Sequence, residues 1–359
     1  MIPYGHQSID DADIAAVAAV LRGDWLTQGP AVEQFEDALC ATTGARHAVA
    51  FANGTAALHA AAAVADLGPG DTVATSPLSF VASANCARYV GADVTFIDID
   101  PDTWNLDVRA IPEGVDALVA VHFAGLPIAL DALNRRPRVV IEDAAHAIGA
   151  LTPDGPVGNC AHSDMTCFSF HPVKTITTGE GGAVTTNSTV YADALRRFRS
   201  HGMVRSPSFP AWWYDVPEPG YNYRLTDMQA ALGTSQLAKL EAFVVRRNDL
   251  ASRYRTLLAD AEVGLPPSAP ANSRHAHHLF PVLVTNRDEV FAGLRDAEIG
   301  TQVHYRPIYR HSTYATQGFD PSSFPACEYV ADRILSLPLY PTLSDTDQER
   351  VVEVLTKLA

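Results

Sequence analysis

A single lysine, Lys174, lies in the segment FSFHPVKTITTGEGG (residues 168–182), between aromatic residues and a glycine-rich turn. The segment begins with an apolar run that predicts a buried strand, and ligands of open α/β sheets bind at strand ends. A lysine partly removed from water has a lowered pKa, so its neutral amine can attack a carbonyl carbon and form an imine. The alternative is a solvated loop lysine, which is the usual role of a lysine taken alone.

Three other stretches place polar or aromatic residues at the ends of predicted strands. The first is NGTAALH, which opens a predicted helix. The free amides at the start of this helix can bind a phosphate beside Gly54, or Asn53 can simply be the helix N-cap. The second is EDAAHA, where Asp143 can face a cationic ring nitrogen or cap a helix. The third is SFVASANC, in which Phe80 is either a stacking platform or a core residue.

Each of these four signals is weak alone, but together they supply the parts that pyridoxal phosphate (PLP) needs. They are a phosphate cradle, an aromatic wall for the ring, a carboxylate for the pyridinium nitrogen and an imine-forming lysine. Along the chain, Lys174 follows Asp143 by thirty-one residues. The combination therefore indicates a PLP site at one edge of a sheet.

The elements that would position these residues are short runs rich in Val, Ile and Phe that do not alternate polar and apolar residues. This pattern is typical of buried strands in a mostly parallel sheet. Helical segments between the runs can serve as crossovers, so we predict an α/β domain over residues 10–235. The predicted strands are 47–51, 72–76, 94–99, 116–121, 138–143, 165–170 and 181–186, and the predicted crossover helices are 53–67, 79–90 and 130–136.

A long helical segment, 227–261, leads out of this domain into a predicted smaller α+β region. That region would contain a strand in HHLFPVLVT, a helix in DEVFAGLRDA, a strand in TQVHYRPIY and two C-terminal helices. We therefore divide the chain into a large domain, 1–235, and a small C-terminal domain, 236–359. The N-terminal helix can be counted with either domain, because it can pack on the small one.

Composition limits the class of protein. The 359 residues are 47% hydrophobic and 19% charged, which is typical of a soluble globular protein. The formal net charge of −15 makes nucleic acid a poor partner. The five scattered cysteines, the absence of an N-terminal apolar core and the lack of a long apolar run predict a cytoplasmic protein without disulfides or membrane segments. The HAHH cluster at 275–278 does not predict a metal site, because alternate side chains of a strand face opposite ways.

Nearly the whole chain resembles the DegT/StrS-like sugar aminotransferases, which are fold-type-I PLP enzymes. The resemblance is carried by WLTQGPAVEQFE, NGTAALH, IEDAAHAIGA, FSFHPVKTITTGEGGAVTTN, RSHGMVR, GYNYRLTDMQAALGTSQLAKL and VHYRPIY. The stretches SHGM and QVHYRPIY are most similar to the pseudaminic-acid-pathway (PseC-type) transaminases. Some family members are sugar dehydratases with histidine in place of the lysine, and Lys174 disfavours that branch.

The resemblance implies roles for individual residues. Lys174 would hold PLP as the internal aldimine, and Asp143 would pair with the pyridine nitrogen. The further cofactor contacts that it implies are Gly54, Thr55, Ala56 and Ser169 at the phosphate, Phe80 on the ring face, His146 near the ring hydroxyl, and Asn222 reaching the phosphate of the neighbouring subunit. The last contact implies a homodimer with shared active sites.

The same resemblance predicts the reaction. An amino group would pass from glutamate to the C4 keto group of a nucleotide-linked 4-keto-6-deoxy-(N-acetyl)hexosamine in a ping-pong cycle through pyridoxamine phosphate. Alternatives are transamination of another nucleotide sugar or a cyclitol, a dehydratase, or a regulatory protein of the same fold. The candidate contacts to the sugar nucleotide are His201, Arg205, Arg224, His304, Tyr305 and Arg306, each of which can also be an ordinary surface or core residue.

Overall fold

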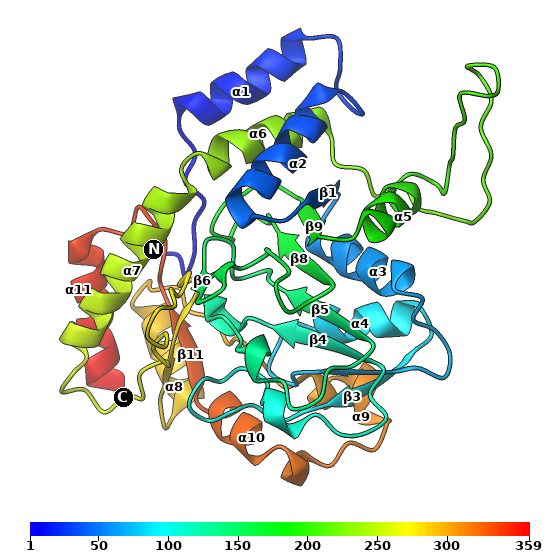
Figure 1. The fold of residues 1–359 in the computed structure, drawn as a ribbon. Helices are drawn as coiled ribbons and strands as arrows, with labels where there is room; N and C mark the ends of the chain where they lie inside the picture. The colour runs from blue at the N-terminus through cyan, green and yellow to red at the C-terminus, as the bar shows by residue number, and fades with distance from the viewer.

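A computed structural model describes residues 1–359. Its centre is a seven-stranded sheet with the order β1-β9-β8-β5-β4-β2-β3 (Figure 1). Neighbours from β8 to β3 run parallel, whereas β9 is antiparallel to both β1 and β8. The strands are β1 (His47–Phe51), β2 (Thr72–Thr75), β3 (Asp93–Phe96), β4 (Ala117–Val121), β5 (Val139–Asp143), β8 (Met165–Ser169) and β9 (Gly182–Thr186). All seven strands of the sequence prediction are confirmed.

Helices cover both faces of this sheet, which explains why its strands are apolar on both sides. In β1, Val49 and Phe51 join the core beneath one set of helices, and Ala48 and Ala50 join the core beneath the other. The first set is α3 (Gly54–Val64), α4 (Ala82–Tyr89) and α5 (Thr189–Arg199), and the second is α2 (Pro30–Thr43) and α6 (Asp227–Leu237). The α/β architecture with a mostly parallel sheet is thereby confirmed.

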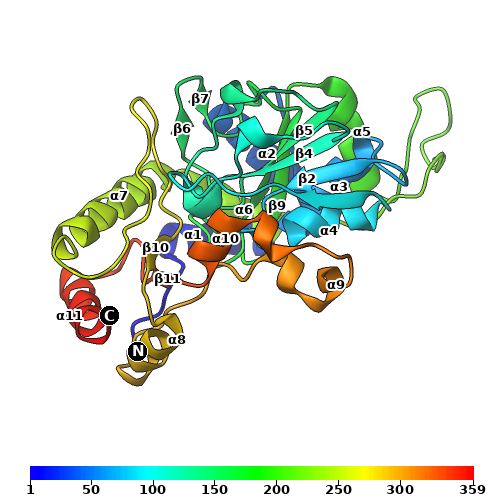
Figure 2. The same cartoon turned by 90° about the horizontal axis from the view of Figure 1, so that it is seen from below.

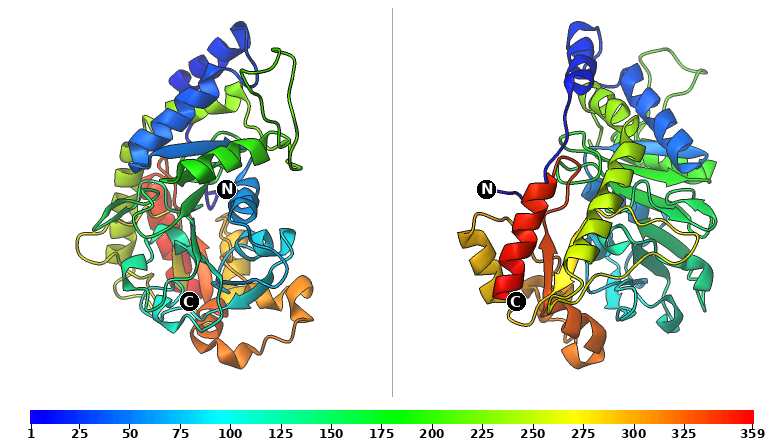
Figure 3. Two further views of the ribbon diagram at one scale, coloured as in Figure 1. Left: turned by 45° about the vertical axis from the view of Figure 1, so that its right-hand side comes forward. Right: turned by 90° about the vertical axis from the view of Figure 1, so that its left-hand side faces the viewer.

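A separate core of nineteen buried residues forms around a two-stranded antiparallel sheet in the C-terminal part of the chain. In Figure 3, α7 and α11 lie side by side next to this small sheet. The elements are α7 (Leu240–Leu257), β10 (Phe280–Leu283), α8 (Arg287–Asp296), β11 (Ile334–Leu337) and α11 (Asp345–Leu358). The domain boundary at 235/236 stays a prediction.

The remaining elements are short or peripheral. Helix α1 (Asp11–Arg22) packs against α6, and Figure 2 shows α9 and α10 beneath the main sheet. These elements are α9 (Ser312–Ala315), α10 (Pro325–Ala331), β6 (Leu151–Thr152), β7 (Gly155–Pro156) and the 3₁₀ turns Val108–Ala110, Phe123–Gly125, Leu130–Ala132, Ile308–Arg310 and Pro321–Ser323. None of the helices combines the length and apolar character that a bilayer crossing requires.

Three expected elements differ from the structure. The predicted helix 130–136 is only a 3₁₀ turn over Leu130–Ala132. The predicted strand in 301–309 forms one isolated bridge, from Gln302 to Ser336, before Pro307 interrupts it. The long helix 227–261 is two helices, α6 and α7.

Candidate active site

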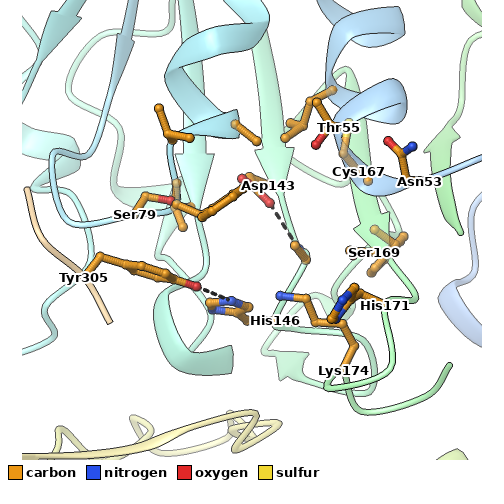
Figure 4. Close-up of a pocket in the computed structure, with 18 of the residues that line it drawn as sticks. Asn53, Thr55, Ser79, Asp143, His146, Cys167, Ser169, His171, Lys174 and Tyr305 are labelled. Carbon is orange, nitrogen blue, oxygen red and sulfur yellow. Dashed lines mark hydrogen bonds between the residues drawn. The ribbon is translucent and has the colours of Figure 1, made fainter. Parts of the chain in front are cut away.

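A cavity of about 1100 Å³ lies where the carboxyl ends of β5 and β8 meet the start of α3 (Figure 4). Its other wall comes from the segment 302–306 of the C-terminal region, far away in sequence. Parallel strands bring their carboxyl ends to one edge of a sheet, which is why distant motifs converge here. Those of the predicted residues that line the cavity are Gly54, Thr55, Ala56, Phe80, Asp143, His146, Ser169, Lys174, His304, Tyr305 and Arg306.

Lys174 differs from the two other lysines of the chain. Burial lowers the pKa of Lys174 to about 8, although the nearby Asp143 carboxylate opposes this shift. For Lys239, burial is outweighed by hydrogen bonds to acidic side chains of the N-terminal region, which raise its pKa. Lys357 is exposed and paired with Glu353 on α11. Lys174 is therefore the lysine best suited to act as a neutral amine near neutral pH.

Asp143 is the last residue of β5 and is only 5% exposed. Its Oδ2 accepts a hydrogen bond from Ser83 Oγ at 2.7 Å, and its Oδ1 accepts one from the Ala145 amide at 3.2 Å. The side chains of Asp143 and Lys174 face the same cavity (Figure 4). An acid and an amine are thus presented to one ligand-sized space.

The start of α3 forms a concave set of backbone donors. Asn53 is the N-cap, and its Oδ1 accepts the Ala56 amide at 2.8 Å, so the cap interpretation is confirmed, while the phosphate cradle stays a prediction. The Gly54 and Thr55 amides have no acceptor within the protein. A Cβ on Gly54 would stand 2.8 Å from the Cβ of Ser169, which explains the glycine. Free amides at a helix start, flanked by hydroxyls, fit a phosphate group.

Buried imidazoles form the wall beside Lys174. His146 Nε2 lies 3.1 Å from the Tyr305 hydroxyl, and its ring centroid lies 4.4 Å from that of His278. Burial lowers the pKa of His146 and His278 well below the ordinary value, and lowers that of His304 to about 3. These rings are therefore neutral at pH 7. His146 Nδ1 is buried without a partner, which suits a hydroxyl group of a bound ligand.

The structure brings some predicted residues together and leaves others apart. Phe80 stands at the cavity with 57% of its surface exposed, so it is not a core residue. Arg224 lines a different cleft, of about 490 Å³, together with Arg199 and Glu36. The predicted residues that do not line the Lys174 cavity of their own chain are His201, Arg205, Asn222 and Arg224. Their roles stay predictions.

Sequence reasoning missed several residues of the site. Ser79 lines the cavity and bonds to Ser83 directly behind it, and both belong to the stretch SFVASANC, in which the sequence indicates only Phe80. The sequence presents His278 only as part of the HAHH cluster, yet it alone of those histidines lines the cavity. The four-residue spacing of the two serines at a helix start was the available signal, because it places both hydroxyls on one side.

Comparisons with known proteins agree with this geometry. Residues 7–356 match the model of the DegT/DnrJ/EryC1/StrS aminotransferase family. The spore coat polysaccharide biosynthesis protein SpsC of Bacillus subtilis is 38% identical over 375 residues, covering 99% of this chain and 96% of that protein. The UDP-4-amino-4-deoxy-L-arabinose–oxoglutarate aminotransferase of Shewanella sediminis is 35% identical, covering 99% and 98%.

Solved structures give the same result. The putative sugar aminotransferase Spr1654 of Streptococcus pneumoniae, in its PMP form, superposes with a TM-score of 0.93 at 28% identity, covering 100% of this chain and 99% of that one. PseC of Helicobacter pylori superposes with a TM-score of 0.90 at 29% identity, covering 99% and 98%. Spr1654 is also known in a PLP form. The chain therefore belongs to the DegT/DnrJ/EryC1/StrS aminotransferase family and is a PLP-dependent sugar aminotransferase.

Proposed function

We propose that this enzyme moves an amino group from glutamate to the C4 keto group of a nucleotide-linked 4-keto-6-deoxyhexosamine, which can be N-acetylated. The observation that carries the proposal is the placement of Lys174 and Asp143 in one cavity with the free amides of α3. The choice of substrates is supported by two similar proteins. One is named for a UDP-linked 4-amino sugar and oxoglutarate, and the other for pseudoaminic acid biosynthesis.

The residues present fit PLP at each of its polar groups. The Gly54 and Thr55 amides and the Ser169 hydroxyl would hold its phosphate. Asp143 would hold its ring nitrogen, and the unpartnered Nδ1 of His146 would face its ring hydroxyl. When bound, PLP supplies an electron-withdrawing ring that stabilises negative charge at the carbon losing a proton.

The chain itself supplies proton transfer and an environment of suitable charge. With a pKa of about 8, the Lys174 amine can take up a proton and return it near neutral pH. The Asp143 carboxylate would face a protonated ring nitrogen and stabilise its positive charge. The neutral histidines beside the amine add no competing positive charge.

The lysine assignment is tested by trapping the imine. Purified protein reconstituted with PLP is reduced with borohydride and digested, and the modified peptide is identified by mass spectrometry. We expect the label on Lys174 alone, with Lys239 and Lys357 as internal controls, and loss of turnover in Lys174→Ala. Label on either control lysine, or wild-type turnover in Lys174→Ala, contradicts the assignment.

The sugar assignment is tested separately, with a panel of UDP- and dTDP-linked 4-keto sugars, glutamate and mass detection of the amino product. We expect amination of at least one 4-keto-6-deoxyhexosamine nucleotide. Amination only of other keto sugars or of a cyclitol would favour transamination of that substrate instead, while leaving the lysine chemistry intact.

We also propose that two copies of the chain share their active sites. Asn222 is exposed and lies outside its own cavity, at the base of the segment 203–221, which projects from the body (Figures 1 and 2). That segment exposes Trp212, Tyr214 and Phe209, an apolar surface that a second subunit would cover.

Co-expression of two differently tagged variants tests the sharing. Lys174→Ala and Asn222→Asp, the latter placing a negative charge beside the phosphate, are each expected to be strongly impaired. If Asn222 acts in the partner's site, a mixed dimer keeps one site with both native residues, so activity returns. If the purified mixed dimer is no more active than the variants alone, Asn222 does not act across the interface.

A further inference from the structure

The inference concerns a serine behind the site rather than in it. Ser83 lies on α4, is fully buried and does not line the cavity. Its Oγ donates to Asp143 Oδ2 at 2.7 Å. Its oxygen also lies 2.7 Å from Ser79 Oγ, and Ser79 does line the cavity. The two hydroxyls therefore form a short chain that ends on the Asp143 carboxylate.

These contacts determine how the carboxylate is held. Asp143 is nearly buried, and the donors within hydrogen-bonding distance of its two oxygens are Ser83 Oγ and the Ala145 amide, one for each oxygen. A carboxylate oxygen can accept more than one hydrogen bond, so both keep lone pairs for a ring nitrogen. Two donors attached to different oxygens fix the rotation of the carboxylate about its Cβ–Cγ bond.

Within α4 itself, Ser83 makes no hydrogen bond as strong as the one to Asp143. Its hydroxyl is also within 3.1 Å of the Phe80 carbonyl, but α4 begins after Val81 without a side-chain cap. A hydroxyl has one proton, and an ionised acceptor at shorter distance binds it more strongly than a backbone carbonyl does. The hydrogen bond from Ser83 Oγ to Asp143 is therefore stronger than the one to the Phe80 carbonyl.

We propose that Ser83 is a positioning residue that orients the Asp143 carboxylate toward the ring nitrogen of PLP. This rests on the proposed role of Asp143. Without the hydroxyl, the carboxylate loses one of the two donors that fix its rotation, so it is aligned with the ring nitrogen less of the time. A protonated ring nitrogen is then stabilised less, so the ring is protonated to a smaller extent and withdraws electrons less effectively.

The chain offers a matched control on the opposite face of β5. There, Ser163 donates to the buried carboxylate of Glu142, the residue before Asp143. Ser163→Ala removes the same kind of serine–carboxylate bond without reaching the cavity. Ser83→Cys gives a second test variant, because it fills the position of the hydroxyl while providing only a weak donor.

The experiment uses the full-length enzyme reconstituted with PLP labelled with ¹⁵N in its ring. The ¹⁵N chemical shift reports ring protonation, and turnover and PLP affinity are measured alongside. We expect Ser83→Ala to move the resonance toward the unprotonated value and to lower kcat/KM about tenfold, the scale of one hydrogen bond to a charged group. Ser83→Cys should fall between, and Ser163→Ala should match wild type in resonance and kcat/KM.

Two outcomes overturn the proposal: an unchanged resonance in both Ser83 variants, or an equal change in Ser163→Ala. Asp143→Asn separates this from the assignment on which it rests. If Asp143→Asn shifts the resonance and neither Ser83 variant does, only the role of Ser83 is wrong. If Asp143→Asn leaves the resonance unchanged, the assignment of Asp143 is wrong as well.

Discussion

Glu142 and Asp143 are consecutive carboxylates at the end of β5, nearly equally buried, and they face opposite sides of the sheet. Asp143 has one side-chain donor, Ser83, and opens onto the cavity. Glu142 is closed off: His122 Nε2 lies 2.7 Å from one oxygen, while Ser163 and Thr166 donate to the other.

The hydrogen bonds explain the different character of the two sites. His122 Nδ1 accepts the Ile128 amide, so Nε2 carries a proton and donates it to Glu142. Burial alone would raise the pKa of Glu142, but the donors from His122, Ser163 and Thr166 lower it overall. Glu142 therefore has all its partners within the fold, whereas Asp143 still has lone pairs to offer a ligand. A single step along a strand separates a structural carboxylate from one available for chemistry.

The largest expected effect comes from Asp143→Asn. The amide is similar in shape but carries no charge, so it cannot stabilise a protonated ring nitrogen. We expect kcat/KM to fall on the order of 100-fold or more, with a melting temperature within a few degrees of wild type. Steady-state kinetics and thermal unfolding of the holoenzyme check this. If Asp143→Asn kept nearly full activity, Asp143 would be no more important for the chemistry than Glu142, and the contrast between the two carboxylates would be wrong.

Glu142→Gln should show the opposite pattern. The amide cannot serve His122, Ser163 and Thr166 as the carboxylate does, so one buried donor loses its acceptor. We expect a loss of about 2 kcal/mol in the free energy of unfolding, with kcat/KM close to wild type. The folded-state pKa of Glu142 lies below its ordinary 4.5. Its stabilising contribution is thus complete above about pH 4.5 and is lost as the pH falls through the folded-state value.

Denaturant unfolding of both proteins between pH 3 and pH 8 measures this difference. The stability gap between wild type and Glu142→Gln should be widest at neutral pH and should narrow in acid. A gap that stays constant with pH would show that the variant merely disturbs packing.

The sequence was sufficient for the elements and positions that depend on local pattern. The seven buried runs, the glycine-flanked start of α3 and the strand-ending Asp143 could be predicted because each is a contiguous signal. Converging strand ends then explained how Lys174 and Asp143 reach one space. Their shared cavity agrees with that reasoning.

Residues whose role depends on packing between distant segments were not predictable in this way. Nothing local distinguishes Ser83 from Ser163, since the acceptor of each is fixed only when α4 and β5 are in place. His278 reaches the site because the C-terminal region folds back against His146. The break between α6 and α7 lies where Gln236 and Lys239 bond to Asp13 of α1, another contact between distant segments.

The smallest expected effect is a change in the pKa of Lys174, which tests whether Asp143 and Glu142 act on opposite faces of β5. Its pKa of about 8 reflects burial opposed by Asp143, and Glu142 does not contribute to it. In the apoprotein, reductive trapping of Lys174 with a small aldehyde should rise about tenfold per pH unit and level off above about pH 8, since only the neutral amine reacts. Asp143→Asn removes the opposing charge, so the midpoint of the pH dependence of trapping should move to lower pH, whereas Glu142→Gln should leave that midpoint unchanged.

Mass spectrometry of the Lys174 peptide measures the extent of trapping, and the exposed Lys357 peptide corrects for the reagent's own pH dependence. If both variants shift the midpoint equally, the two faces of β5 are not electrostatically separate, and the contrast between the two carboxylates fails.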